Sequence, residues 1–191
     1  MKKTIYIIEH LEPELFEWCL IEYEHISETI GKENLWFTNI KPSDAKKLEK
    51  FGKVFLESVK NMKLSNACVL DPECDKTLTS SETNSFDYLI FGGILGDYPP
   101  RKRTQEELTP FIKNAEIRNI GKEQMSTDNA VYTVKQIENG KKLQDLKFKN
   151  GISIEINEFE SVELPYLYNI RDKKPFMSAK LIRYLKKKKS F

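Results

Sequence analysis

The chain has 191 residues and a net charge of +2, with 39% hydrophobic and 31% charged residues. This composition is typical of a soluble globular protein with one substantial domain and room for an appendage. No apolar run approaches the roughly 20 residues that span a bilayer, so we expect no membrane contact. Two histidines and three cysteines without a C-x-x-C pair disfavour a zinc site, and we expect no metal. The odd cysteine count and the lack of a signal-peptide pattern favour a reducing compartment, the cytoplasm.

The charge is distributed unevenly. Residues 171–191 contain nine Lys/Arg and one acid, a balance of +8, which leaves −6 for the other 170 residues. An acidic body favours a cationic substrate, whereas a basic tail favours a polyanion nearby. The sequence leaves two explanations open for Lys186 to Lys189, namely a solvated, disordered terminus or a contact with nucleic acid.

Up to about residue 140, apolar runs alternate with helical patterns. The expected strands are 4–8, 35–37, 67–70, 86–91 and 116–120. The expected helices are one from Pro13 to a cap at Gly31, a helical region from Pro42 interrupted by Gly52, one over 105–113 with a Thr104/Glu107 capping box, and one from Ser126 to Glu138. This alternation predicts an α/β fold with a mostly parallel sheet covered by helices.

After Lys142 the pattern changes to short alternating runs. Asn150-Gly151 between Phe148 and Ile152 is typical of a type I′ hairpin turn. A short helix from Ser178 is possible within the basic tail. We therefore expect a main domain over 1–142, a β-hairpin extension packed on it over 143–170, and a basic tail over 171–191.

The stretch 86–100 carries the strongest functional signal. A buried strand, 88–91, leads directly into Gly92, Gly93 and Gly96, and then into Asp97 and Pro99-Pro100. Glycine loops at the carboxyl ends of buried strands are common ligand sites in α/β proteins. The spacing matches neither a P-loop nor G-x-G-x-x-G, so this loop predicts a small-molecule pocket without naming the molecule.

Three other segments follow predicted parallel strands and would meet this loop at one edge of the sheet. They are Glu9-His10, Leu70-Asp71-Pro72 and 120–128. Together they offer glycine amides, apolar walls and carboxylates, a mixture that suits a ligand with a flat heterocycle and a cationic end.

Three pieces of the chain carry a family resemblance. They are Ile7-Ile8-Glu9-His10 with Glu17-Trp18, then Phe86-Asp87-Tyr88 through Phe91-Gly92-Gly93-Ile94-Leu95-Gly96-Asp97-x-Pro99-Pro100-Arg101-x-Arg103-Thr104, then Gln124-Met125-x-Thr127-Asp128-x-Ala130. In this order the chain, from about residue 4 to about residue 170, resembles the SPOUT-class protein-arginine methyltransferases. Their characterised eukaryotic type modifies an arginine of a small-subunit ribosomal protein. The lysine-rich tail follows no family pattern.

The resemblance implies a SPOUT-type sheet with a deep C-terminal trefoil knot, which general topology rules would not suggest. It also implies S-adenosylmethionine as cofactor, a monomeric enzyme, and an arginine of a small-subunit ribosomal protein as substrate. The implied cofactor-binding residues are Leu70, Asp71, Pro72, Phe91, Gly92, Gly93, Ile94, Leu95, Gly96, Ile120, Gly121, Gln124, Met125, Ser126 and Thr127.

Arginine is cationic and must lose a proton as its nitrogen attacks, so carboxylates are suited to orient it and accept that proton. We expect Glu9 and Asp97 to be these catalytic groups. The expected substrate-binding residues are His10, Glu17, Trp18, Arg101 and Arg103, with Trp18 stacking on the guanidinium plane. Trp18 is otherwise explained as a core residue, and the two arginines as solvated side chains.

Two other functions stay open. A SPOUT RNA methyltransferase would share the fold and cofactor; the acidic body argues against it and the basic tail, through a possible rRNA contact, argues for it. A catalytically inactive ribosome-binding adaptor would bind no cofactor.

Overall fold

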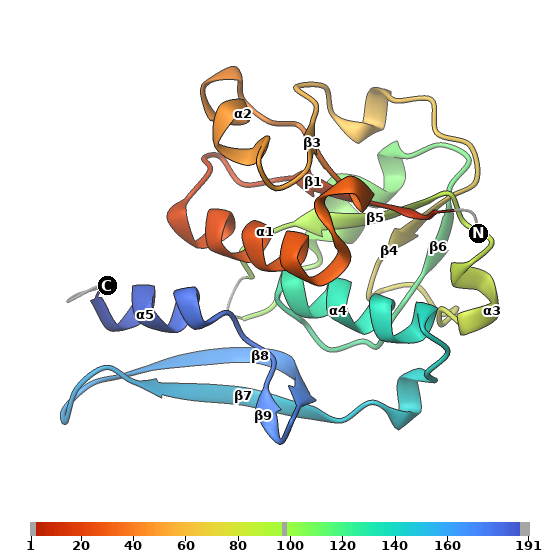
Figure 1. The fold of residues 1–191 in the computed structure, drawn as a ribbon. Coiled ribbons are helices and arrows are strands. Elements are labelled where there is room, and N and C mark those ends of the chain that lie inside the picture. Colours follow the sequence, from red (N-terminus) through yellow and green to blue (C-terminus); the bar gives the residue numbers. More distant parts are fainter. Residues whose placement is uncertain (1–2, 97–98, 188–191) are drawn as a thin grey trace.

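The computed structural model describes residues 3–96 and 99–187 (Figure 1). Its larger sheet has six parallel strands in the order β3-β2-β1-β5-β4-β6. These strands are β1 (Ile5–His10), β2 (Leu35–Thr38), β3 (Lys53–Val54), β4 (Ala67–Leu70), β5 (Tyr88–Gly93) and β6 (Glu116–Arg118). The predicted α/β fold with a mostly parallel, helix-covered sheet is confirmed.

The described residues form five α-helices beside the sheets: α1 (Glu17–Ile30), α2 (Pro42–Leu48), α3 (Ser80–Thr83), α4 (Thr127–Glu138) and α5 (Ala179–Lys187). Helices α1 and α4 lie side by side between the large sheet and the β7–β8 hairpin (Figure 1). Among the helices that residues 3–96 and 99–187 form, none combines the length and apolar character needed to cross a membrane.

The central strands are buried on both faces, which explains their unbroken apolar runs. On one face Ile8 and Leu89 pack with α1 and α4 in the main core. On the other, Ile7 and Ile90 pack with Val59 and Leu108, which come from the short helical turns Val59–Asn61 and Thr104–Leu108 rather than from long helices. Packed side chains therefore cover both faces of β1 and β5.

Two predicted helices differ from the structure. Helix α1 begins at Glu17 and not at Pro13, although Gly31 caps it with φ +83° as expected. The helix expected over 105–113 is only two short helical turns, Thr104–Leu108 and Thr109–Phe111. Pro110 lacks the N–H that a continuous helix needs at this point. The expected capping box is absent here because the Glu107 carboxylate accepts from Arg103 instead.

Strands β1 and β5 both end two residues later than predicted, and β5 also begins two residues later. Glu9 and His10 belong to β1, and they pair with Gly92 and Gly93 of β5. The first two glycines of the predicted loop are therefore strand residues. β6, in contrast, ends at Arg118, two residues earlier than expected.

The second sheet is antiparallel, with β7 (Phe148–Glu155), β8 (Ser161–Arg171) and β9 (Lys174–Pro175). Asn150-Gly151 does not form the predicted turn but lies inside β7, where Gly151 has φ +67°. Between the pairs Asn150–Leu167 and Ile152–Leu164, β8 has one residue more than β7. The positive φ of Gly151 therefore lies at the point where the pairing register of β7 and β8 shifts by one residue. The chain reverses direction later, over 156–160.

The basic tail is folded as far as it is described. Helix α5 buries Leu181 and Leu185 against Ile21 of α1 and Ile154 of β7. Lys180 forms an ion pair with Glu24. Lys186 and Lys187 end the helix as exposed residues, and the rest of the predicted lysine run, at 188 and 189, lies outside the described residues. Figure 1 shows α5 beside α1 and above the hairpin.

Candidate active site

A cavity of about 300 Å³ lies at the carboxyl ends of β4, β5 and β6. Its walls come from the segments that follow these strands and from the turn at 100–105. The predicted cofactor-binding residues that line it are Leu70, Asp71, Pro72, Phe91, Gly92, Ile94, Gly96, Ile120, Gly121, Gln124, Met125 and Thr127. The sequence thus identified the three segments that meet at this edge.

Three residues predicted to contact the cofactor do not line the cavity. A side chain on Gly93 would meet the Tyr23 hydroxyl and Ile8 in the core, because Gly93 faces α1. The Leu95 amide donates to the Glu12 carboxylate at 2.9 Å. The Ser126 hydroxyl donates to Asp128 at 2.6 Å at the start of α4.

Gly96 is the point where three segments come closest together. A Cβ at this position would collide with the Gln124 amide and would lie 2.5 Å from Cε1 of Tyr166. The Tyr166 hydroxyl also donates to the Gly96 carbonyl at 3.0 Å. Only glycine allows this close approach, so the third glycine of the motif is explained by packing around the cavity.

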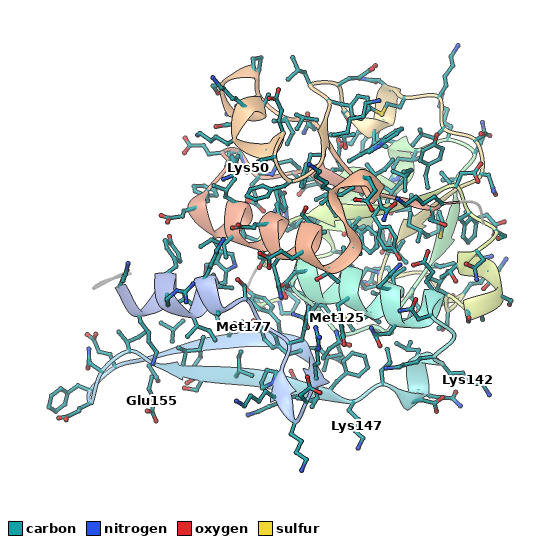
Figure 2. All side chains as sticks on the ribbon, viewed as in Figure 1. Lys50, Met125, Lys142, Lys147, Glu155 and Met177 are labelled. Atoms are coloured by element: carbon teal, nitrogen blue, oxygen red, sulfur yellow. The ribbon has the colours of Figure 1, made fainter. Side chains whose placement is uncertain are left out.

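Gln124 provides an unsatisfied donor in the cavity wall. Its Nε2 is buried and has no hydrogen-bond partner among the described residues. Its backbone carbonyl accepts from the Leu167 amide of β8 at 2.8 Å. Figure 2 places its neighbour Met125 between α4 and the hairpin. A buried amide without a partner is costly, and a ligand acceptor in the cavity would satisfy it.

Asp71 closes the β4 side of the cavity. Its carboxylate is buried and accepts from the Thr109 hydroxyl at 2.6 Å and from the Glu73 amide at 2.9 Å. These contacts fix the short turns at 104–111 against the end of β4.

Arg103 lines the cavity, but its guanidinium is used within the protein. It donates to Glu107 at 2.8 Å, to Glu12 at 2.7 Å and to the Leu11 carbonyl at 3.1 Å. The hydrogen bond to Glu107 raises the pKa of Arg103 further above its ordinary value. Because Glu12 also accepts from Leu95, Arg103 and Glu12 together tie the segment after β5 to the segment after β1. Arg101 is exposed at the cavity rim.

Glu9, predicted to be catalytic, does not line the cavity. Its buried carboxylate accepts hydrogen bonds from the Thr38 hydroxyl, the Ser58 hydroxyl and the Val59 amide. It therefore joins β1, β2 and the turn at 58–59. The other predicted catalytic residue, Asp97, lies outside the described residues. Both catalytic roles stay predictions.

His10 is also turned into the protein. Its Nδ1 lies 2.8 Å from the Tyr23 hydroxyl, and burial lowers the pKa of its imidazole. Glu17 is exposed at the start of α1. The structure thus brings neither His10 nor Glu9 to the cavity.

A second hollow lies next to the first and shares Gly96 with it. It has a volume of about 540 Å³ and is lined by Trp18, Gly96 and residues 162–166 of β8. The Trp18 indole N–H donates to Glu22 at 2.7 Å. Burial raises the pKa of the Glu22 carboxyl well above its usual range, and the nearby Asp128 adds to this effect.

Comparison with known proteins identifies the family to which this chain belongs. The model of the family described as "Protein arginine N-methyltransferase SFM1-like" matches residues 5–190. The chain belongs to this family. It is 34% identical to the protein arginine N-methyltransferase SFM1 of Saccharomyces cerevisiae over 95% of this chain and 94% of the yeast protein.

Solved structures of the yeast enzyme resemble this SFM1-like protein closely. The yeast arginine methyltransferase SFM1 complexed with SAM has a TM-score of 0.88 at 31% identity, covering 98% of this chain and 92% of the yeast chain. The complex with SAH has a TM-score of 0.85 at 31% identity, covering 95% and 94%. Trm10 from Thermococcus kodakaraensis, 14% identical with a TM-score of 0.57 over 74% of this chain and 96% of that chain, shares the fold alone.

Three residues around the two hollows were not predicted from the sequence: Glu12, which accepts from Leu95 and Arg103, and Glu163 and Tyr166, which line the second hollow. Glu12 comes two residues after the end of β1 and so lies at the same edge of the sheet as Glu9. This position is a signal from which its place near the site could have been predicted. Pro165 inside an extended run was another, because proline in a strand marks an edge or a bulge. Nothing in the sequence indicated that Tyr166 would reach Gly96, since that contact spans two sheets.

Proposed function

We propose that this SFM1-like methyltransferase uses S-adenosylmethionine to methylate an arginine side chain of a small-subunit ribosomal protein. We further propose that it acts in the cytoplasm and as a monomer. The observation that carries the proposal is the cavity at the ends of β4, β5 and β6, built from the glycine segment and from 120–127. Because the chain belongs to a family of protein arginine methyltransferases, we propose methyl transfer to arginine as the reaction at this cavity.

The residues of the cavity fit the proposed cofactor. Leu70, Ile94, Ile120 and Met125 give apolar walls for a flat heterocycle. The unpartnered Gln124 amide offers a donor. The lining carries both signs of charge, with Asp71 and Glu73 on one hand and Arg101, Lys102 and Lys122 on the other, which suits a ligand that has both a cationic and an anionic group.

Bound S-adenosylmethionine supplies an activated methyl group, so that a guanidinium nitrogen forms the new N–C bond as the C–S bond breaks, leaving S-adenosylhomocysteine and a proton. The protein's task is then to position the nitrogen in line and to take the proton. We assign that proton to a carboxylate, and Asp97 is our first candidate because it follows Gly96 directly in the chain. Glu9 is the second, although its hydrogen bonds give it a structural task.

We also propose a trefoil knot within residues 1–142, with 143–170 as an extension. Two contacts between residues far apart in the sequence support it: the Thr127 hydroxyl lies 3.5 Å from the carbonyl oxygens of Gly92 and of Ile94. These contacts place the start of α4 against the end of β5, where a threaded segment would pass.

Two measurements test the function. Calorimetry with S-adenosylmethionine should show binding at one site, and no binding would favour an adaptor. Labelled cofactor should then transfer methyl groups to arginine in a mixture of small-subunit ribosomal proteins and not to naked rRNA. Transfer to rRNA would instead favour the RNA methyltransferase. The cationic residues Arg101, Lys102 and Lys122 in the cavity lining are the feature that supports this alternative.

A further inference from the structure

The surface around β3 is basic within an otherwise acidic body. Residues 46–63 contain six lysines and two glutamates, a balance of +4. Since residues 1–170 as a whole carry −6, the rest of that stretch carries −10. The basic segment runs from α2 through β3 to the short turn Val59–Asn61. Figure 1 shows α2 and β3 on the side of the large sheet away from the β7–β8 hairpin. This local excess of positive charge favours an anionic partner.

Lysines of this segment are held over aromatic rings. In β3, Nζ of Lys53 lies 5.0 Å from the ring centroid of Trp36 and 4.7 Å from that of Phe55. In the turn that follows, Nζ of Lys60 lies 4.8 Å from the ring centroid of Phe111. Every cation–π contact in the described part of the chain involves a lysine of this segment. An aromatic ring attracts an ammonium group without neutralising it, so these positions keep their charge.

The same lysines have no carboxylate partner. Lys50, Lys53 and Lys60 form no ion pair with any residue that the structure describes. The two acids of the segment, Glu49 and Glu57, are exposed. Lysines that do pair with carboxylates are Lys3, Lys47, Lys102, Lys122, Lys135 and Lys180. Phosphate groups would give the unpaired ammonium groups their anionic partners.

The aromatic rings beside these lysines are partly accessible. Phe111 is 52% exposed, and Trp36, Phe55 and Tyr88 are half-buried. The ring centroid of Trp36 lies 4.9 Å from that of Phe55 and 5.5 Å from that of Tyr88. Lys53 pairs in register with Trp36, so lysine and rings share one face of the sheet. Unpaired bases stack on such rings, whereas an acidic peptide or a lipid headgroup has no planar group to stack.

We infer that the surface formed by 46–63 with Trp36 and Phe111 binds single-stranded RNA, with the lysines on phosphates and the rings against bases. It surrounds β3, the outermost strand, whereas the cofactor cavity lies at β4, β5 and β6. Bound RNA is therefore an anchor and not the group that is methylated. The choice of RNA over DNA rests on the proposed function, whose substrate belongs to an RNA-containing particle; the binding itself needs no methyl transfer.

The test measures binding of the full chain, without cofactor, to a fluorescein-labelled, unstructured RNA of about 20 nucleotides. Fluorescence anisotropy gives the affinity between about 0.05 and 0.2 M salt. The triple variant Lys50→Gln, Lys53→Gln, Lys60→Gln loses three phosphate contacts, and each contributes about 0.7 to the slope of log K against log salt concentration. The slope should become shallower by about 2, and the affinity at about 0.1 M salt should fall by about a hundredfold.

The matched control removes the same charge on the opposite side of the molecule. It is the triple variant Lys142→Gln, Lys147→Gln, Lys149→Gln, whose lysines are exposed. Figure 2 shows Lys142 and Lys147 beside the hairpin and Lys50 near α2. Screening limits the effect of distant charges, so the control should lose less than about threefold in affinity. An equal loss in both triple variants would show attraction by net charge alone and overturn the inference, as would a parent chain that binds no RNA.

Stacking is tested separately by Phe111→Leu. The affinity should fall by roughly fivefold to a hundredfold at an unchanged salt slope, because a ring is lost while the charge of Lys60 stays. Polyglutamate of equal charge should displace the RNA weakly. Equal displacement, or full affinity in Phe111→Leu, would overturn RNA as the partner. Because the cofactor is absent from these measurements, a failure of the proposed methylation appears only in the transfer assay and stays distinguishable.

Discussion

The parallel sheet and the C-terminal region contribute to the site by different physical means. The cofactor cavity is made by segments that leave strands buried on both faces, with Ile7, Leu89 and Ile90 at full burial. The second hollow is bordered by the β7–β8 hairpin. This hairpin packs with α1 and α5 in a smaller apolar cluster that is separate from the main core. The first cavity thus depends on a sheet that is buried on both faces, and the second hollow depends on a smaller and separately packed cluster. Because their cores are separate, we expect the two regions to unfold at different denaturant concentrations.

The largest effect is expected from Leu185→Ala in the C-terminal region. Leu185 is fully buried between α5, α1 and the hairpin, and removing such a side chain typically costs about 2–5 kcal/mol. Trp18 borders this cluster and Trp36 borders the far face of the large sheet. In single-tryptophan variants, Trp18 fluorescence should lose its native signal at a lower denaturant concentration than Trp36. Coincident transitions would show that the two regions unfold together; Arg183→Ala, exposed on α5, is the control.

Glu9→Gln should act on the sheet region. The amide keeps the shape but loses charge-assisted hydrogen bonds from Thr38, Ser58 and the Val59 amide, at a cost of about 1.5–3 kcal/mol. Chemical denaturation should show this loss in the Trp36 signal. If Glu9 is catalytic, turnover falls far more than the folded fraction does. A loss of stability with full turnover per folded molecule removes Glu9 from the mechanism.

Gly93→Val separates packing from ligand binding. A branched side chain here would meet Tyr23 and lie 2.9 Å from Cγ2 of Ile8, and such overpacking costs about 1–3 kcal/mol. The sequence analysis assigned Gly93 to the cofactor site, and if Gly93 faced the ligand this change would abolish cofactor binding. The structure instead predicts a lower Tm with cofactor affinity retained by the folded fraction. Calorimetry on the folded variant decides between the two.

A smaller effect should follow from the titration of His10. Burial lowers the pKa of its imidazole, so the unfolded chain binds the proton more readily than the folded one. His10 therefore costs stability as the pH falls below about 6.5 and towards the folded pKa, and costs nothing above that range. Glu22, whose pKa is raised, acts in the opposite sense. The difference in unfolding free energy between the parent and His10→Gln should hence vary with pH below 6.5; a constant difference would contradict this.

The smallest expected effect concerns the end of the tail. Lys186 and Lys187 are exposed beyond the buried Leu185, so removal of 186–191 leaves the packed part of α5 in place. We expect weaker binding to small ribosomal subunits, with a greater loss in dilute than in concentrated salt. Methylation of a free target peptide should survive. Collapse of peptide methylation would instead make the tail part of the active site.

The sequence predicted the sheet region better than the hairpin. Continuous apolar runs and the glycine segment define the buried strands and the edge where they end, so 67–70 matched β4. The actual hairpin turn could not be located, because Gly151 has the positive φ of a turn residue but uses it inside β7. Local sequence reports backbone conformation there, whereas the position of the turn depends on how β8 packs against α4 and α5.

The same limit applies to site residues. Glu9 has the residue type and position of a catalytic acid, and only its partners Thr38 and Ser58 assign it a structural task. These partners lie 29 and 49 residues away along the chain. Residues on the motif segments were therefore predictable, and contacts between segments were not.

The hydrogen bond from the Leu167 amide to the Gln124 carbonyl also has a consequence for biosynthesis. A chain emerging from the ribosome folds its N-terminal portion first. The cavity segment 120–127 then waits for a strand that is translated about forty residues later, and that strand in turn is covered by the last helix. A chain that ends before β8 lacks the contacts of Leu167 with Gln124 and of Tyr166 with Gly96, so we expect its cavity segments to be less well held.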